Sequence, residues 1–376
     1  MTHPPAEFSA VIPVRDDPVR LERLLQGLRE HAPADLLREI IVVDDGSAAP
    51  PGAVCARHDA VMLRVSPGRG PAHARNVGAA AASGTHLFFF DADVAYAPGV
   101  MEKAAALFAA DPELGAACFL NQRHDAADNA VRNFGAAIEH YWFRVYLADG
   151  GDTGPLSGFT TRNGAIRREV FDALGGFSES FDTNAGEDYD FGKRLIRDHR
   201  SVITASPLLY HAFPDRLSRL FRNYFVRAAL FVPYFLRHRP PLDKTQTSSG
   251  EALLRLVGVG AAGMVPLGFL PVVGGYAGAA FLVLAVLYTA SLSGFLRTAW
   301  RWCGEGHPKA FEFTGDPDAG VRREIRRGGG RCLRFAAACL LIHWASSCVI
   351  TAGGLWGLTR HLLSRRAAAA AAGGAP

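Results

Sequence analysis

The chain has 376 residues, of which 49% are hydrophobic, and a formal net charge of +4. This length suggests about two domains, and the apolar content is enough for a large core. So small a net charge does not predict a nucleic-acid partner. The six cysteines include no Cys-x-x-Cys pair, which argues against a disulfide framework and favours free thiols in a reducing compartment. No basic segment followed by an apolar run opens the chain, so we expect no cleavable signal peptide and a cytosolic N-terminal part.

Strand-like and helix-like segments alternate over the first part of the chain. Short apolar runs typical of buried strands lie at 8–14, 38–47, 60–65 and 86–94. Apolar residues at helical spacing predict helices at 18–31 and 71–84. Strands and helices that alternate in this way predict an α/β fold with a parallel sheet of the Rossmann type. Ligands of such sheets bind at the carboxyl ends of the strands.

Two pairs of aspartates directly follow predicted strands. Asp44 and Asp45 follow the second strand, and Asp91 and Asp93 follow the fourth, so all four should lie along one edge of the sheet. Residues two apart on an extended segment point the same way, so Asp91 and Asp93 can face one ion. Mg²⁺ and Mn²⁺ prefer oxygen ligands and commonly bind carboxylates together with substrate phosphates. An Asp-x-Asp triplet alone is weak evidence, because such triplets are common in loops.

Six motifs between about residues 8 and 211 occur together in a fixed order. They are VIPVRDD (11–17), IIVVDDGS (40–47), GPAHARNVGAAAASG (70–84), LFFFDADV (87–94), RNGAIRREVFDALGGF (162–177) and NAGEDYDFGKRL (184–195). In this order and spacing they resemble the inverting glycosyltransferases of family 2. The resemblance implies the GT-A fold, in which helices flank a Rossmann-like mixed sheet. It also implies that the donor is a nucleotide-diphosphate sugar.

The resemblance also assigns residues to the donor site. Carried over position by position, these are Pro13, Asp44, Asp45, Arg75, Asn76, Asp91 and Gly164. The carboxylates of Asp44 and Asp45 can accept hydrogen bonds from a uracil N–H or a ribose hydroxyl, although Asp-Asp-Gly-Ser is also good turn chemistry. Arg75 can meet the diphosphate, or it can be an ordinary arginine on a helix surface. Gly164 allows a ligand to approach the backbone closely, or it marks an ordinary bulge.

The acceptor side and the metal site rest on three further residues. Glu187 and Asp188 match the Glu-Asp pair of the family, in which the aspartate is the general base. Such a base takes the proton of the acceptor hydroxyl, which attacks opposite the leaving diphosphate and inverts the anomeric configuration. The alternative is that both only favour a helix N-terminus through its dipole. The resemblance further implies that His211 joins Asp91 and Asp93 in binding Mn²⁺ or Mg²⁺, although a lone histidine is usually structural.

One departure from the family concerns the region after the Glu-Asp pair. Processive polysaccharide synthases carry a Q-x-x-R-W signature there, whereas this chain reads DRLSRLFRNYF at 215–225. We therefore expect transfer of a single sugar and no processive polymerisation.

Long apolar runs follow the resemblance to the family. We predict a cytosolic GT-A domain over residues 1–245, after which the composition changes. Residues 256–296 include no charged side chain and are about twice as long as a membrane span of ~20 residues. We therefore predict a transmembrane helical hairpin over 252–296. A second uncharged run at 335–359 is long enough for a third span, and a buried helical subdomain is the alternative.

The charges around these runs give two topological signals. A loop at 297–334 carries nine Lys or Arg against five Asp or Glu, and the positive-inside rule makes it cytoplasmic. Three spans would then place the tail at 360–376, predicted to be disordered from its low complexity, outside. Arg360, Arg365 and Arg366 argue for a cytoplasmic tail instead. The two signals conflict, so the number of spans and the side of the tail stay open.

Two shorter segments join the parts. Residues 216–238 mix arginines with aromatic residues at helical spacing, so this segment either lies in the membrane interface or packs on the sheet with solvated arginines. Residues 237–251 form a polar linker that contains proline. Within it, Ser248 and Glu251 predict a capping box for a new helix.

The predicted protein is an integral membrane glycosyltransferase with its catalytic domain on the cytoplasmic side. It would move one sugar from a nucleotide-diphosphate sugar to a hydroxyl of a membrane-associated acceptor, such as a glycolipid or lipid-linked glycan. A polyprenyl phosphate is the alternative acceptor, but an anionic phosphate needs no base, so the pair Glu187–Asp188 favours a hydroxyl. A nucleotidyltransferase is disfavoured because residues 11–20 offer no glycine-rich phosphate loop. The intact acidic motifs disfavour a catalytically silent membrane scaffold.

Overall fold

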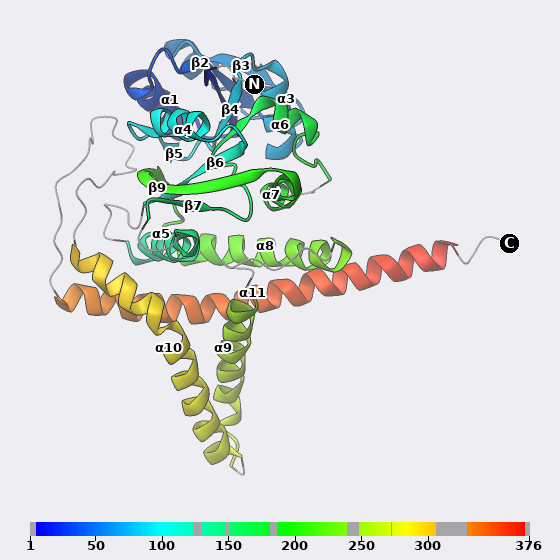
Figure 1. The fold of residues 1–376 in the computed structure, drawn as a ribbon. Coiled ribbons are helices and arrows are strands. Elements are labelled where there is room, and N and C mark those ends of the chain that lie inside the picture. The colour runs from blue at the N-terminus through cyan, green and yellow to red at the C-terminus, as the bar shows by residue number, and fades with distance from the viewer. Residues whose placement is uncertain are drawn as a thin grey trace. The chain divides into compact units, whose positions relative to one another are not determined.

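The computed structural model describes residues 5–122, 129–147, 151–180, 186–238, 248–271, 273–305 and 329–372. The chain forms two compact units, whose elements are labelled in Figure 1. The first unit contains the described residues up to Gln122 and those from Phe143 to Ala212. The second unit contains the described residues from 129 to 142 and those from Phe213 onward.

The first half of the sheet is parallel, as predicted. Its strands, in the spatial order β3-β2-β1-β4, are β1 (Phe8–Val14), β2 (Leu37–Asp44), β3 (Val61–Arg64) and β4 (His86–Phe90). The connecting helices are α1 (Pro18–His31), α2 (Gly52–Arg57) and α3 (Pro71–Ala81). All four predicted strands and both predicted helices are confirmed, with small differences at their ends.

The second half of the sheet introduces antiparallel pairs. Strand β8 (Asn163–Arg167) is antiparallel to both β4 and β6 (Leu114–Asn121), and β9 (Arg200–His211) is parallel to β6. The remaining elements of this unit are β5 (Val94–Ala95), β7 (Thr153–Pro155), α4 (Val100–Ala110), α6 (Arg168–Ala173), α7 (Glu187–Asp198) and the 3-10 helix η1 (Arg144–Tyr146). The sheet is therefore mixed, as the resemblance implied.

The three consecutive phenylalanines of β4 show why this strand is an uninterrupted apolar run. Phe88 and Phe90 belong to the core on one face of the sheet, with α1 and α4, and Phe89 belongs to the core on the other face, with α3, α6 and α7. All three are fully buried. A strand covered on both faces has no polar side, so alternation disappears. Burying each ring contributes about 2 kcal/mol relative to exposing it.

The second unit is helical. It contains most of α5 (Ala130–Phe143), together with α8 (Leu217–His238), α9 (Ser249–Leu267), α10 (Gly274–Glu305) and α11 (Gly329–Ala372). Phe134 of α5 and Leu220 of α8 share a core with Phe295 and Cys339. The predicted catalytic domain over 1–245 is therefore too long, because the apolar faces of α5 and α8 pack with the C-terminal helices.

Three helices of the described chain are long and apolar enough to cross a membrane: Ser249–Leu267, Gly274–Cys303 and Gly330–Ser364. The first two correspond to the predicted hairpin, and α10 continues beyond its predicted end at residue 296. Most of the predicted linker and of the basic loop lies outside the described residues. Helix α11 continues to Ala372, so the tail predicted to be disordered is largely helical, in keeping with the strong helix propensity of its alanines.

The predicted capping box at the start of α9 is confirmed in one of its two hydrogen bonds. The backbone N–H of Glu251 donates to the Ser248 hydroxyl at 3.1 Å. The Glu251 carboxylate does not return this bond. It instead accepts from Arg255 at 2.7 Å and lies 3.1 Å from Nε2 of His343, which ties α9 to α11.

Candidate functional site

Asp44 ends β2 as a buried carboxylate in a turn. Its Oδ1 accepts a hydrogen bond from the backbone N–H of Ser47 at 3.0 Å, so the expected turn role is confirmed. Its Oδ2 lies 3.6 Å from Nε of Arg64 and has no hydrogen-bond partner, although Asp44 is fully buried. Pro13 is also buried in β1, one position before the Val14–Asp44 pair. Asp44 therefore combines a structural role with one acceptor atom that remains available.

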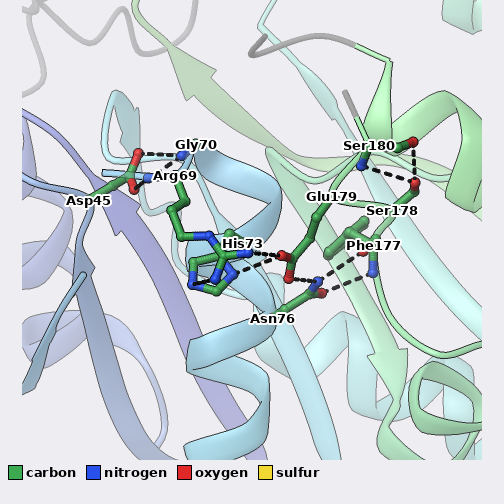
Figure 2. Close-up of polar contacts among 9 residues, drawn as sticks. All are labelled: Asp45, Arg69, Gly70, His73, Asn76, Phe177, Ser178, Glu179 and Ser180. Carbon is green, nitrogen blue, oxygen red and sulfur yellow. Dashed lines mark hydrogen bonds and ion pairs between the residues drawn. The ribbon is translucent and has the colours of Figure 1, made fainter. Parts of the chain in front are cut away.

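Asp45 holds the beginning of α3. The backbone N–H of Arg69 donates to Oδ1 at 2.7 Å, and that of Gly70 donates to Oδ2 at 2.9 Å (Figure 2). Gly68 also lies against the turn, because a Cβ at this position would stand 2.3 Å from the carbonyl oxygen of Asp45. Pro71 then opens the helix with a favourable φ. Asp45 is thus a helix-positioning residue in this structure.

Arg75 joins two acidic positions that are far apart in the sequence. Its Nη1 donates to Oε1 of Glu187 at 2.9 Å, and its Nη2 donates to Oδ1 of Asp91 at 2.6 Å. Arg75 is only 3% exposed, so the alternative of an ordinary surface arginine is wrong. Burial alone would lower the pKa of Arg75, but the charges of Asp91 and Glu187 raise it. The guanidinium is therefore permanently charged between the end of β4 and the start of α7.

Asp93 faces His211. The short strand β5 pairs with the end of β9, which places Oδ2 of Asp93 3.4 Å from Nε2 of His211. Burial would raise the pKa of Asp93, but the charge of His211 and its hydrogen bond lower it to about 2. Its Oδ1 is buried and has no hydrogen-bond partner. His211 is also fixed by Gln122, whose Nε2 donates to the His211 carbonyl oxygen at 2.8 Å, and by Arg162, whose Nη1 lies 3.3 Å from Nδ1.

The two aspartates of the Asp-x-Asp triplet have different partners in this structure. Asp91 pairs with Arg75, and Asp93 pairs with His211. Across the described ranges, no group of three His, Cys, Asp or Glu residues is arranged to hold a metal ion. A shared ion between the two aspartates therefore stays a prediction. Arg162 was missed by sequence reasoning, although it stands directly before the Asn-Gly of a recognised motif.

Glu187 and Asp188 begin α7. Gly186 precedes them with a φ of +110°, a conformation that favours glycine, and both carboxylates lie in the first helical turn. Burial and then the charge of Asp188 raise the pKa of Glu187, although Arg75 opposes this shift. Asp188 is half-buried, and its Oδ1 accepts from the backbone N–H of Tyr189 at 2.8 Å. Both carboxylates lie where the helix dipole favours negative charge, as the alternative interpretation expected. Glu187 has a further structural role, because it forms a buried ion pair with Arg75.

Gly164 has a packing role. It lies within β8, whose pairing with β4 shows no bulge, so the bulge alternative is wrong. A Cβ would stand 2.4 Å from the carbonyl oxygen of Thr160 and 2.6 Å from Cζ of Phe159. In this structure, Thr160 and Phe159 therefore occupy the space next to the Gly164 backbone. Its contact with a donor stays a prediction.

Asn76 anchors a loop onto α3. Its amide donates to the carbonyl oxygen of Phe177 at 2.9 Å and accepts from the backbone N–H of the same residue at 2.9 Å. The amide also donates to Glu179 at 3.0 Å. The hydrogen bonds of Asn76, which we predicted to bind the sugar donor, thus hold the loop that leads toward α7.

Glu179 is the centre of a polar cluster that sequence reasoning missed (Figure 2). Its Oε2 lies 3.0 Å from Nη2 of Arg69 and 3.0 Å from Nδ1 of His73. The hydrogen bond from Asn76 is the main cause that lowers the pKa of Glu179, and His73 and Arg69 add to it. Only the spacing of Arg69, just before α3, and of His73 and Asn76 within it could have indicated the cluster. The cluster links the start of α3, which Asp45 holds, to the loop after α6.

The comparison with protein families covers most of the first unit. Residues 9–175 match the family described as Glycosyl transferase family 2. These residues are similar to family 2 glycosyltransferases, in agreement with the resemblance carried by the motifs.

Curated relatives and a solved structure extend the comparison. Two curated relatives from strains of Mycobacterium tuberculosis, both named pre-mycofactocin glycosyltransferase, are 30% identical over 260 residues. The match covers 66% of this chain and 51% of each relative, so the chain spans about half their length. The structure of the mannosyltransferase PcManGT from Pyrobaculum calidifontis, in complex with GDP-Man and Mn²⁺, has a TM-score of 0.52 at 17% identity. That likeness covers 93% of this chain and 87% of the other, and it supports the GT-A fold.

Proposed function

We propose that the protein is a membrane-anchored, inverting glycosyltransferase that moves one sugar from a nucleotide-diphosphate sugar to a hydroxyl of a membrane-associated acceptor. The observation that carries the proposal is the position of Arg75. One buried guanidinium bonds both Asp91, after β4, and Glu187, beside the proposed base Asp188. This connection supports the proposal that the donor residues and the base form one site. A catalytically silent scaffold has no need for such a buried set of charges.

The donor would lie between the end of β2 and Arg75. Oδ2 of Asp44 is a buried acceptor without a hydrogen-bond partner, which suits an N–H of the base or a ribose hydroxyl. Nε of Arg75 is a buried donor without a partner, which suits an oxygen of the diphosphate. Unsatisfied buried polar atoms are costly, so ligand atoms at these two places would stabilise the protein.

The residues also fit a divalent cation in part. Asp93 and His211 are neighbours, and Oδ1 of Asp93 is buried without a partner, so this pair can supply two ligands. Asp91 would have to exchange its bond to Arg75 to add a third. Mn²⁺ and Mg²⁺ commonly take their remaining ligands from substrate phosphates and water. A bound ion would neutralise the charge of the leaving nucleoside diphosphate.

Asp188 is the proposed general base. A carboxylate accepts the proton of the acceptor hydroxyl while that oxygen attacks the anomeric carbon, and one such displacement inverts the configuration. Glu187 would position Asp188 through its bond to Arg75. The same pair favours a hydroxyl over a polyprenyl phosphate, because a phosphate acceptor is already an anion.

The three apolar helices, which suggest that the protein works at a membrane, support the proposed acceptor class. Glycolipids and lipid-linked glycans are therefore the first acceptors to test. The curated relatives are named for pre-mycofactocin, so this compound is the second. GDP-mannose, present in the PcManGT structure, belongs among the donors.

The test uses detergent-solubilised full-length protein with a panel of nucleotide sugars, Mn²⁺ and either a lipid extract or pre-mycofactocin. Released nucleoside diphosphate and the mass of the glycosylated product are measured. We expect release with one donor, lost with EDTA and at least 100-fold slower in Asp188→Asn, because the base is removed. Asp198→Asn, an exposed carboxylate at the other end of α7, is the matched control. Unchanged turnover in Asp188→Asn would exclude the base, and no release from folded protein with any donor would favour the scaffold.

A further inference from the structure

Helix α11 lies very close to α8 along a stretch of glycines. A Cβ on Gly353 would stand 2.4 Å from the carbonyl oxygen of Phe225, and one on Gly357 would stand 2.2 Å from that of Ala229. Glycine lets two helix backbones approach this closely, and small residues four apart are typical of helix pairs in membranes. The two helices form a tightly packed pair and lie side by side within the second unit (Figure 1).

The glycine contacts fix the register of this pair. From the first contact to the second, the chain advances by four residues on each helix, from Phe225 to Ala229 and from Gly353 to Gly357, so α8 and α11 run parallel. In this register Arg222 is level with Ile350, and Arg227 is level with Leu355, inside the apolar run at 335–359. Both arginines are exposed. If this run crossed a bilayer, α8 would follow it and bring exposed guanidinium groups to the depth of the hydrocarbon, which is strongly unfavourable.

The hairpin of α9 and α10 runs in a different direction. Within the second unit it projects steeply away from α11 (Figure 1). Transmembrane helices tilt by about 0–40° from the bilayer normal, so a hairpin that crosses close to the normal leaves α11 an unfavourable direction for crossing. Residues 256–296 and 335–359 are both free of charged side chains, but only α11 packs along the arginine-bearing α8, so the hairpin is the better span. Its exposed large apolar side chains include Leu256, Phe269, Tyr276, Leu282 and Val286.

The apolar character of α11 has an explanation that does not require crossing. A helix that is apolar on all sides is normally buried all round. Here α8, α9 and α10 cover part of its surface, and the side chains of Leu341, Leu355 and Trp356 are exposed elsewhere on it. The pair therefore exposes both kinds of side chain, with arginines such as Arg222 and Arg227 on α8 and large apolar side chains on both helices, including Val226 and Leu355.

We propose that α8 and α11 lie together in the plane of the membrane surface, on the side that holds the first unit, and that only α9 and α10 cross. The partner of this surface is the headgroup layer of anionic lipids, which attracts the arginines, while Leu355 and Trp356 enter the acyl boundary. Two crossings return the chain to its starting side. Arg360 and the arginines at 365 and 366 then stay on that side, and the conflict between span number and charge disappears.

Single cysteines in the full-length chain, in sealed right-side-out and inverted vesicles, test this placement. Glu113→Cys marks the first unit, Leu270→Cys the tip of the hairpin and Ser364→Cys the late part of α11. All three positions are exposed. Each is treated with a membrane-impermeant maleimide, and the unchanged chain sets the background of its six natural cysteines.

We expect Ser364→Cys to be labelled from the same side as Glu113→Cys, and Leu270→Cys from the opposite side. Labelling of Ser364→Cys from the side of Leu270→Cys, or only after detergent, would overturn the proposal, because α11 would then cross or lie inside the bilayer. Labelling of all three from one side would also overturn it, because the hairpin would not cross. The assay needs no turnover, so its outcome is independent of the proposed reaction.

Discussion

Arg75 and Glu187 form a buried ion pair, with 2.9 Å between Nη1 and Oε1, that connects α3 to the start of α7. The side chains of both residues are almost completely buried, at 4% and 6% exposure. Because Arg75 also bonds Asp91, the position of α7 depends on the same guanidinium that we propose for the diphosphate. Donor binding and placement of the base would therefore be physically coupled.

Removing Arg75 should destabilise the protein strongly. Arg75→Ala leaves Glu187 as an uncompensated buried charge, and breaking a buried pair in this way typically costs about 3–5 kcal/mol. Asp91 is partly exposed and should add little. We expect a large drop in the unfolding midpoint of Arg75→Ala, measured in detergent, and partial recovery in the double variant with Glu187→Gln. Arg197→Ala, on the exposed surface of α7, is the control. An unchanged midpoint in Arg75→Ala would show that the pair contributes nothing to the fold.

The role of Gly164 can be tested by adding one methyl group. Gly164→Ala places a Cβ against the carbonyl oxygen of Thr160, so β8 must shift, and overpacking of this kind costs about 1–3 kcal/mol. We expect a lower unfolding temperature. Gly158→Ala, whose Cβ would meet nothing within 4 Å, is the matched control. A raised KM for the donor without any change in unfolding temperature would instead support a direct contact with the donor.

Glu179 should make stability depend on pH in the acid range. Its pKa lies below the ordinary value of 4.5, so its charged form is favoured by folding and stabilises the protein above that value. This contribution is lost as the pH falls through the lowered pKa. We expect Glu179→Gln to unfold at a lower temperature than the natural chain at pH 7, and the difference to shrink as the pH falls below the ordinary value of 4.5 and through the lowered pKa. Glu113→Gln, on an exposed loop, should show no such difference. A difference that is independent of pH would mean that the charge of Glu179 is not involved.

The glycine contact between α8 and α11 should not tolerate a large side chain. Gly357→Leu would force the two backbones apart, because even a Cβ would stand 2.2 Å from the carbonyl oxygen of Ala229. We expect faster limited proteolysis of α11 and a lower yield of folded protein. Gly330→Leu, in the same helix but with nothing within 4 Å of its Cβ, adds the same apolar bulk without the clash. Equal behaviour of the two variants would argue against tight packing of the pair.

The first half of the fold could be predicted because its signals are local. The apolar runs that end at Asp44 and near Asp91 are strands in the structure, since both faces of the sheet are covered and the apolar pattern is continuous. The antiparallel insertion of β8 between β4 and β6 could not be read from the residues, because strand order depends on pairing between distant segments. The same limit explains why the predicted boundary at residue 245 does not separate α5 and α8 from the sheet.

The candidate site was predictable in its members but not in their partners. The motifs identified Asp91 and Asp93, the resemblance added His211, and the structure brings Asp93 to His211. Asp91, however, bonds Arg75 and does not face the partner of Asp93. This difference depends on where the Arg75 side chain points from α3, and the spacing of residues along the sequence gives no information about that direction. Glu179 was missed for a similar reason, because its partners lie on α3 and just before it, about a hundred residues away in the sequence.

The buried turn at Asp44 has a consequence for the choice of nucleobase. Both oxygens of Asp45 already accept backbone hydrogen bonds, so Oδ2 of Asp44 is the carboxylate atom of this pair that remains free of one. An ionised carboxylate accepts hydrogen bonds but donates none. If the base of the donor meets this atom, as we propose, uracil and guanine offer a ring N–H to it, whereas cytosine and adenine present a ring nitrogen that is itself an acceptor. UDP- and GDP-sugars should accordingly compete best for the site, because CDP- and ADP-sugars can donate to this atom only through their exocyclic amino group, with the ring nitrogen beside it repelling the carboxylate.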